Sequence, residues 1–176
     1  IPIVGTIGSQ LQVSATAAGW VLTANLLAAV VATPVIGRLA DLHGKRPVLL
    51  AVLLLVLVGS LVAALTHSLA LLILGRVLQG AGAISAAVTA LAADLTREQH
   101  RTKVMAMIGS SIGLVFALSL VGAPLLYGWI GMGGLFSMTG VLALAAIVLL
   151  LKAVPPAPPP HGHEKLPLRR VIFDTD

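Results

Sequence analysis

The stretch that decides the fold is Gly37-Arg38-Leu39-Ala40-Asp41-Leu42-His43-Gly44-Lys45-Arg46-Pro47, an island of charge between two apolar runs. Residues 1–37 contain no Lys, Arg, Asp or Glu, and residues 47–75 contain none either. Because about 20 residues of α-helix cross a bilayer core about 30 Å thick, each run predicts a membrane-spanning helix. The island is therefore predicted to be a turn, with Gly44 just after one span and Pro47 at the start of the next.

The composition agrees with this interpretation. Hydrophobic residues make up 58% of the 176 residues and charged residues 10%, which is typical of an integral membrane protein with the lipid bilayer as its partner. The net charge of +5 would suit a nucleic acid, but aromatic residues, which stack bases, amount to 3%, so we expect no nucleic-acid partner. Cys is absent, and His161 and His163 are too few ligands for a metal site.

The apolar runs predict an all-α fold with six spans. Residues 1–153 form one transmembrane lobe, and the Pro-rich residues 154–176 form a cytoplasmic linker. The uncharged run 104–151 is too long for one span, and the glycines of 128–134 divide it. Spans are expected at about 1–8 (the end of a truncated first helix), 15–39, 47–65, 69–93, 97–127 and 133–152.

Local signals refine these spans. Ser14 and Ser68 are predicted to cap the helices that follow them. Thr96 and Gln99 match the capping box, in which each side chain satisfies a free backbone N–H at a helix start. The span 47–65 is the most uniformly aliphatic, so we expect it to face lipid.

The basic residues predict the orientation. Ten of the 11 Lys and Arg residues fall in loops 38–47, 94–103 and 152–176, and none falls in the connections on the other side, 9–14, 66–68 and 128–134. Loops rich in Lys and Arg remain in the cytoplasm, so these three basic loops are predicted to be cytoplasmic. We expect the protein in a bacterial inner (plasma) membrane.

Arg76 is the exception, because it falls within a predicted span about 12 Å from the outer helix end. Insertion there costs about 2.5–3.5 kcal/mol, so its side chain should face protein or a watery cavity. The six carboxylates all fall in cytoplasmic segments, which leaves Arg76 without an acidic partner. Either Arg76 reaches toward the outer headgroups with Gln79 as a partner, or it belongs to a transport pathway. Asn25 is a second polar residue within a span, and Asn can also tie helices together.

Three motifs, taken together, resemble the major facilitator superfamily, in particular its drug:proton antiporters. They are Gly37-x-Leu39-Ala40-Asp41-x-x-Gly44-Lys45-Arg46, then Gly75-Arg76-x-x-Gln79-Gly80-x-Gly82-Ala83, and finally Gly109-x-x-x-Gly113 with Gly122-Ala123-Pro124-x-x-x-Gly128. Leu42 departs from the Arg usual in the first motif, and Ala123 and Tyr127 depart from glycines of the third. The chain is similar both to 14-span drug exporters and to YajR-like 12-span exporters.

The resemblance implies a carrier of two six-helix lobes, each built from two three-helix repeats, with a small-molecule substrate bound between the lobes. This chain would form most of the first lobe, and the C-terminal six-helix lobe of the same protein would be its partner. The family's first-span acid would precede Ile1 and would pair with Arg76.

The resemblance also implies roles for residues. Arg76, Gln79 and Asn25 would line the substrate or proton pathway. A cytoplasmic gating motif would close the inner side, and the fifth-span motif would pack that helix closely, although its glycine spacing also fits ordinary helix packing. The gating residues are Gly37, Asp41, Gly44, Lys45, Arg46, Asp94, Arg97 and Arg101, and the packing residues are Gly109, Gly113, Gly122, Pro124 and Gly128.

The expected function is secondary active transport, namely proton-coupled efflux of drugs or other amphipathic molecules by alternating access, with the proton as coupling ion and no cofactor. One alternative is an uncoupled or import-type carrier of a sugar or small metabolite, and another is a membrane anchor or assembly subunit without transport. An Asp or Glu upstream of Ile1 would favour the exporter. We expect no enzymatic activity, because the sequence offers no Ser-His-acid or phosphate-cradling arrangement.

Overall fold

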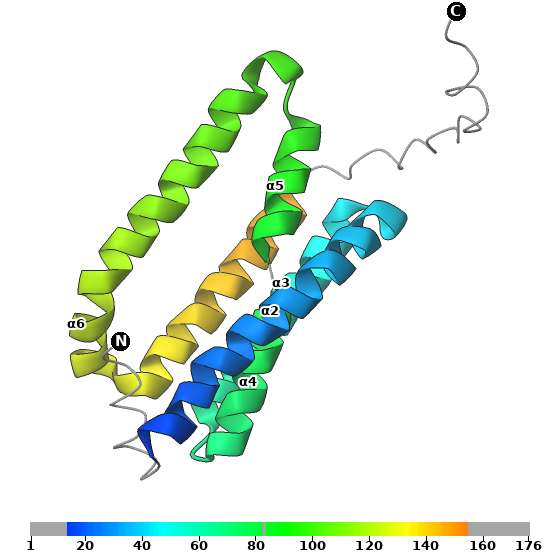
Figure 1. Cartoon of the computed structure of the whole chain (residues 1–176). Helices are drawn as coiled ribbons and strands as arrows, with labels where there is room; N and C mark the ends of the chain where they lie inside the picture. The colour runs from blue at the N-terminus through cyan, green and yellow to red at the C-terminus, as the bar shows by residue number, and fades with distance from the viewer. Residues whose placement is uncertain (1–13, 83, 155–176) are drawn as a thin grey trace, which may run out of the picture.

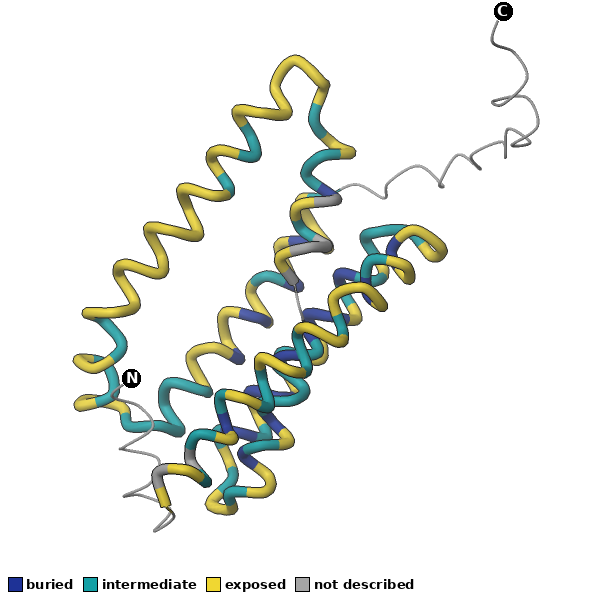
Figure 2. The backbone as a smooth tube through the Cα atoms, in the orientation of Figure 1, coloured by how far each residue is buried: buried dark blue, intermediate teal, exposed yellow. Residues whose placement is uncertain are grey.

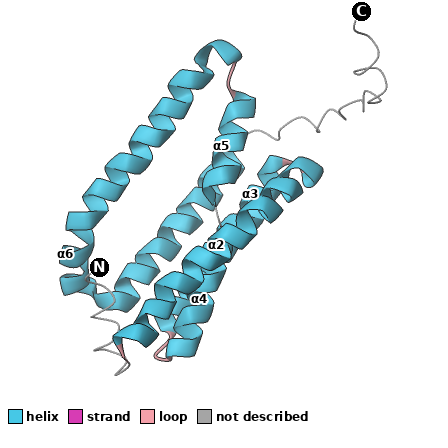
Figure 3. Cartoon of the chain, in the orientation of Figure 1, coloured by secondary structure: helices cyan, strands magenta, loops and turns pink. Residues whose placement is uncertain are grey.

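The computed structural model describes residues 14–82 and 84–154, and within them all regular structure is helical (Figures 1 and 3). The predicted first span 1–8 and the linker from residue 155 onward lie outside the described residues. The helices are α2 (Ala15–His43), α3 (Lys45–Leu65), α4 (Leu69–Ala81), α5 (Ile84–Leu95) and α6 (Glu98–Ala153). By length and composition, α2, α3 and α6 of the described part could each cross a membrane, and α4 is a shorter apolar helix.

The charged island forms the turn between α2 and α3. Gly44 adopts a φ of 88°, in the left-handed region that favours glycine, so its predicted place after a helix end is confirmed. The helices reach further into the island than predicted, because α2 ends at His43 rather than Leu39 and α3 begins at Lys45 rather than Pro47. Pro47 fits the first turn of α3 because the first four N–H groups of a helix have no partner within it.

The expected continuous span 69–93 is broken in two. α4 ends at Ala81, and Gly82 leaves helical geometry with φ −80° and ψ 47°, while its N–H bonds back to the carbonyls of Leu78 and Gln79. The sequence around the break is Gly80-Ala81-Gly82, and glycine weakens a helix by about 1 kcal/mol relative to alanine. The predicted span 69–93 is therefore built from two helices, α4 and α5, rather than from one continuous helix.

The long helix α6 consists of two arms. Gly131 has a φ of 66° and a ψ of −172°, so residues 98–130 form a first arm and residues 132–153 a second arm that runs back beside it. This turn confirms the predicted break within 128–134. The second arm packs on the other helices, whereas the first arm stands away from them and is exposed along most of its length (Figure 2).

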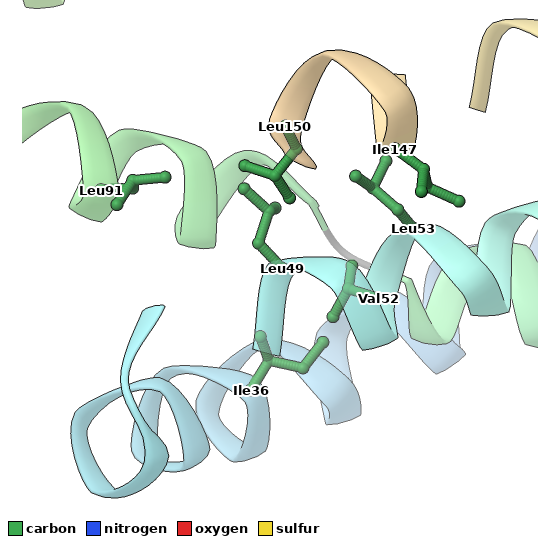
Figure 4. Packing of buried hydrophobic residues seen from close by; sticks show 7 residues of the cluster. All are labelled: Ile36, Leu49, Val52, Leu53, Leu91, Ile147 and Leu150. Atoms are coloured by element: carbon green, nitrogen blue, oxygen red, sulfur yellow. The ribbon is translucent and has the colours of Figure 1, made fainter. Parts of the chain in front are cut away.

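The core consists of two apolar clusters along the bundle of α2, α3, α4 and the second arm. One lies toward the α2–α3 turn and joins residues from α2, α3, α5 and α6 (Figure 4). The other lies toward the α3–α4 turn and joins Val21, Ala63 and Leu72. Residues of the first cluster are Ile36, Leu49, Val52, Leu53, Leu91, Ile147 and Leu150.

The helix α3 is central to the bundle, and one side of it, with Leu54, Val58 and Leu61, stays exposed, so the expectation that it faces lipid applies to that side alone. It contacts all four of the other described helices, and it buries Gly59, Ser60 and Ala63 among other residues. Aliphatic side chains suit lipid and protein interior equally, so composition could not separate the two environments. The small residues near its end were the better signal, because they permit close helix contact.

The predicted caps have different outcomes. The Ser14 hydroxyl accepts the N–H of Ala17 at 3.2 Å, which confirms the cap of α2. Ser68 precedes α4, but its side chain makes no capping bond. The capping box is absent, because Arg97 is the residue before α6 and the Thr96 hydroxyl instead donates to the carbonyl of Ala92 at 2.6 Å. The Thr96 hydroxyl thus bonds to a backbone carbonyl at the end of α5 rather than to a free N–H group at the start of α6.

Candidate functional site

A polar cluster lies inside the bundle between the two apolar clusters, and Arg76 is its charged member. Arg76 is placed on α4, two turns from Ser68, and is partly buried. Its Nη1 donates to Oε1 of Gln79 at 3.0 Å, and its guanidinium carbon lies 5.6 Å from the centroid of the Phe136 ring on the second arm of α6. A cation over an aromatic face is stabilised by about 0.5–2 kcal/mol, more when water is excluded.

Ser60 connects this charge to α3. The Gln79 Nε2 donates to the Ser60 Oγ at 2.8 Å, and the Ser60 hydroxyl donates to the carbonyl of Val56 at 2.7 Å. Ser60 has no exposed surface. Sequence analysis missed Ser60, although it is the sole polar side chain between residues 47 and 65, and it missed Phe136, for which the sequence gives no signal.

Asn25 ties α2 to α4. Its Nδ2 donates to the backbone carbonyl of Arg76 at 2.9 Å. A Cβ added at Gly80 would collide with the carbonyl oxygen of Asn25, so only glycine lets the two helices approach here. This contact agrees with the helix-tying interpretation of Asn25, and it assigns Gly80 to helix packing.

The charge of Arg76 has no carboxylate partner in the described part of the chain. No ion pair to Arg76 occurs among these residues, and its buried Nε atom has no hydrogen-bond partner there. A guanidinium has five N–H donors and no acceptor. The cluster is therefore an electropositive site with unused donor capacity in the middle of an apolar bundle.

A second group of charges lies at the end of the bundle where α2 meets α3. Lys45 at the start of α3 forms an ion pair with Asp94 near the end of α5. Arg46 Nη2 donates to the carbonyl of Leu151 at 3.1 Å, and Arg101 Nη2 donates to the carbonyl of Ala93 at 3.3 Å. These contacts, which we call the basic clasp, join the ends of α3, α5 and both arms of α6.

Other residues of the predicted gating motif lie outside the clasp. Asp41 is exposed, and its carboxylate has no hydrogen bond or ion pair within the described part of the chain. Arg97 is also exposed, and its carbonyl accepts the N–H of His100. Gly37 has open space where a side chain would be, and Gly44 supplies the turn. The structure thus brings together Lys45, Arg46, Asp94 and Arg101, but not the first Asp of the motif.

The fifth-span motif lies on the first arm of α6. A Cβ added at any of its glycines would meet no described atom within 4 Å, and Pro124 is exposed within the continuous arm. The predicted close packing of this helix is therefore not found against other described residues of this chain. The glycines in question are Gly109, Gly113, Gly122 and Gly128.

Comparison with known proteins gives the family. The sequence profile of the Major Facilitator Superfamily matches residues 1–173. The inner membrane transport protein YajR of Escherichia coli is 42% identical over 157 residues, 88% of this chain and 34% of YajR. The uncharacterized MFS-type transporter Rv1877 of Mycobacterium tuberculosis is 36% identical over 74% of this chain and 18% of its own length. The efflux pump dotC of Dothistroma septosporum is 38% identical over 60% of this chain and 18% of dotC. The matched segment thus covers 18% to 34% of the length of these relatives. The chain belongs to the Major Facilitator Superfamily, whose members are transporters rather than enzymes.

Proposed function

We propose that this chain forms the first lobe of a secondary transporter that exports drugs or other amphipathic small molecules in exchange for protons. The observation that carries the proposal is Arg76, a permanent positive charge between two apolar clusters with no carboxylate among its described partners. Ionisable residues inside membrane-spanning bundles are costly and mark substrate or ion pathways. A helix bundle with an anchoring role alone has no use for such a charge.

The charge suggests how protons and substrate are coupled. A carboxylate from another part of the full-length transporter, when ionised, would pair with the guanidinium of Arg76. Protonation of that carboxylate removes the attraction, so the protein rearranges at the cluster. There the Arg76 guanidinium already contacts Gln79 on its own helix and Phe136 on the second arm of α6. A bias of a few kcal/mol between two conformations is sufficient for alternating access.

The basic clasp is proposed as the inner gate. Basic loops remain on the cytoplasmic side, so loops 38–47, 94–103 and 152–176 would face the cytoplasm of a bacterial cell. The Lys45–Asp94 pair links α3 to α5 there. This pair would form when the inner side is closed and would separate when it opens.

The relatives support export without establishing it for this chain. YajR is an inner membrane transport protein, and dotC is an efflux pump. Both are about three or more times as long as the matched segment, which fits a lobe within a larger transporter.

Everted membrane vesicles that contain the full-length transporter test the proposal. Respiration acidifies the vesicle lumen, and a transported amphipathic cation added outside should release protons from it, as read by a pH-sensitive dye. An ionophore that collapses the gradient should stop substrate uptake, and vesicles without the transporter serve as the control. Substrate uptake at an unchanged rate with the gradient collapsed would refute proton coupling and would favour an uncoupled carrier.

A further inference from the structure

Ser60 is a fully buried hydroxyl in an aliphatic helix, and it touches the candidate site only through Gln79. It lies on α3, while Gln79 and Arg76 lie on α4. Gly59 and Gly75 bring these two helices together, because a Cβ at Gly59 would lie 2.6 Å from the Gly75 carbonyl oxygen. This close crossing is what allows a side chain as short as serine to reach Gln79.

The hydrogen bonds of Ser60 have a fixed direction. A serine hydroxyl has one proton to donate and two lone pairs to accept with. The proton is directed to the Val56 carbonyl at 2.7 Å, so the Oγ atom can only accept from Gln79. The amide nitrogen of Gln79 must therefore face Ser60, and its oxygen must face the guanidinium of Arg76 at 3.0 Å.

The reversed amide would be unfavourable at both ends. The Ser60 hydroxyl would then have to leave the Val56 carbonyl in order to donate to the Gln79 oxygen, and the Gln79 NH₂ group would face the N–H donors of Arg76. Unsatisfied polar groups of this kind are costly inside a bundle. Ser60 and Arg76 therefore favour the same amide orientation of Gln79, and in that orientation Ser60 anchors the amide that holds the guanidinium near the ring of Phe136.

We infer that Ser60 is a positioning residue for transport, which orients Gln79 so that Arg76 stays inside the bundle rather than extending toward the outer headgroups. The inference rests on the proposed role of Arg76 in transport. Ser60 itself touches neither substrate nor proton carrier in this account. Its effect on transport passes entirely through the Gln79 side chain.

A double-mutant cycle in the full-length transporter tests this inference. Ser60→Ala should lower substrate-driven proton release about three- to tenfold, the factor expected for one lost hydrogen bond. Gln79→Met removes the amide that Ser60 orients, so adding Ser60→Ala to it should cause no further loss. A merely structural role for Ser60 would lower activity by a similar factor in both backgrounds, and that result would overturn the inference.

Two further variants control for folding. Ser60→Cys keeps a small side chain with a weak acceptor, so its activity should lie between those of wild type and Ser60→Ala. It replaces Ser60→Ala in the cycle if the alanine variant does not fold.

Thr33→Ala removes an exposed hydroxyl that, like that of Ser60, donates to the carbonyl four residues earlier, here at 2.7 Å, and it should leave transport unchanged. A Ser60→Ala variant with wild-type activity at equal expression would overturn the inference.

Substrate flux separates this inference from the proposed function. If the wild-type transporter moves substrate without releasing protons, the proposed coupling fails. The same double-mutant cycle, read as substrate flux, then still decides whether Ser60 acts through Gln79.

Discussion

Two regions of this chain carry glycines inside their helices, but they use these glycines differently. In the α3–α4 crossing, Gly59 and Gly75 lie so close that an added Cβ on either would stand within 3 Å of the carbonyl oxygen of the other. On the first arm of α6, Gly109 and Gly113 have no described atom within 4 Å of such a Cβ. Small residues thus permit close packing, and whether packing occurs depends on which helix is available as a partner.

The difference also separates two kinds of surface. Within lipid, helices associate through van der Waals packing and interhelical hydrogen bonds rather than through the hydrophobic effect. The α2–α3–α4 region has both, because close glycine contacts accompany the bond from Asn25 to the Arg76 carbonyl and the bond from Gln79 to Ser60. The first arm carries Gly109 and Gly113 one turn apart within an exposed apolar surface, which we expect to contact the other lobe of the full-length transporter.

Substitution in the packed region should have the largest effect. Gly80→Ala places a Cβ against the carbonyl oxygen of Asn25, and α2 and α4 must then separate. We expect a loss of about 3 kcal/mol in unfolding free energy, the upper end of the usual cost of overpacking. Thermal unfolding in detergent measures this change, and a melting temperature equal to that of wild type would show that the two helices are not in close contact.

The basic clasp should contribute less to stability and more to transport. Lys45→Gln should change the unfolding free energy by at most about 1 kcal/mol, because Asp94 is 50% exposed and such ion pairs are weak. The same substitution should slow transport if the pair closes the inner gate, and the exchange Lys45→Asp with Asp94→Lys should restore it. Lys103→Gln, at an exposed position outside the clasp, is the control. Failure of the charge exchange to restore transport would argue against the gate.

Substitution of a glycine on the exposed arm should cause no loss of stability. In Gly113→Ala the added methyl group meets open space within the described part of the chain. The substitution also raises helix propensity, so the free energy of unfolding should rise by no more than about 1 kcal/mol. Transport should nevertheless fall if this face packs on the other lobe. Loss of stability comparable with that of Gly80→Ala would contradict the contrast between the two regions.

The features that sequence reasoning found are those with a strong local cause. The turn at Gly44 follows from a charged island between uncharged runs, and the break near Gly131 follows from a run too long for one span. Both turns need glycine because both adopt positive φ.

The features that it missed depend on which helices are neighbours. The central place of α3 could not be read from a uniformly aliphatic sequence, and the role of Phe136 depends on a contact across 60 residues of chain. The break at Gly82 competes with a helical pattern on both sides, so local propensity alone did not decide it. The capping box failed because Thr96 had a nearer partner in the Ala92 carbonyl.

The most direct test of the account concerns the charge of Arg76. Substrate-driven proton release should be measured for the reconstituted full-length transporter as wild type, as Arg76→Lys and as Arg76→Gln, with unfolding temperatures to confirm that each variant is folded. Arg76→Gln should reduce proton release by a factor of about 100 or more, and Arg76→Lys should keep part of it because the charge remains. Wild-type proton release by folded Arg76→Gln would contradict the account.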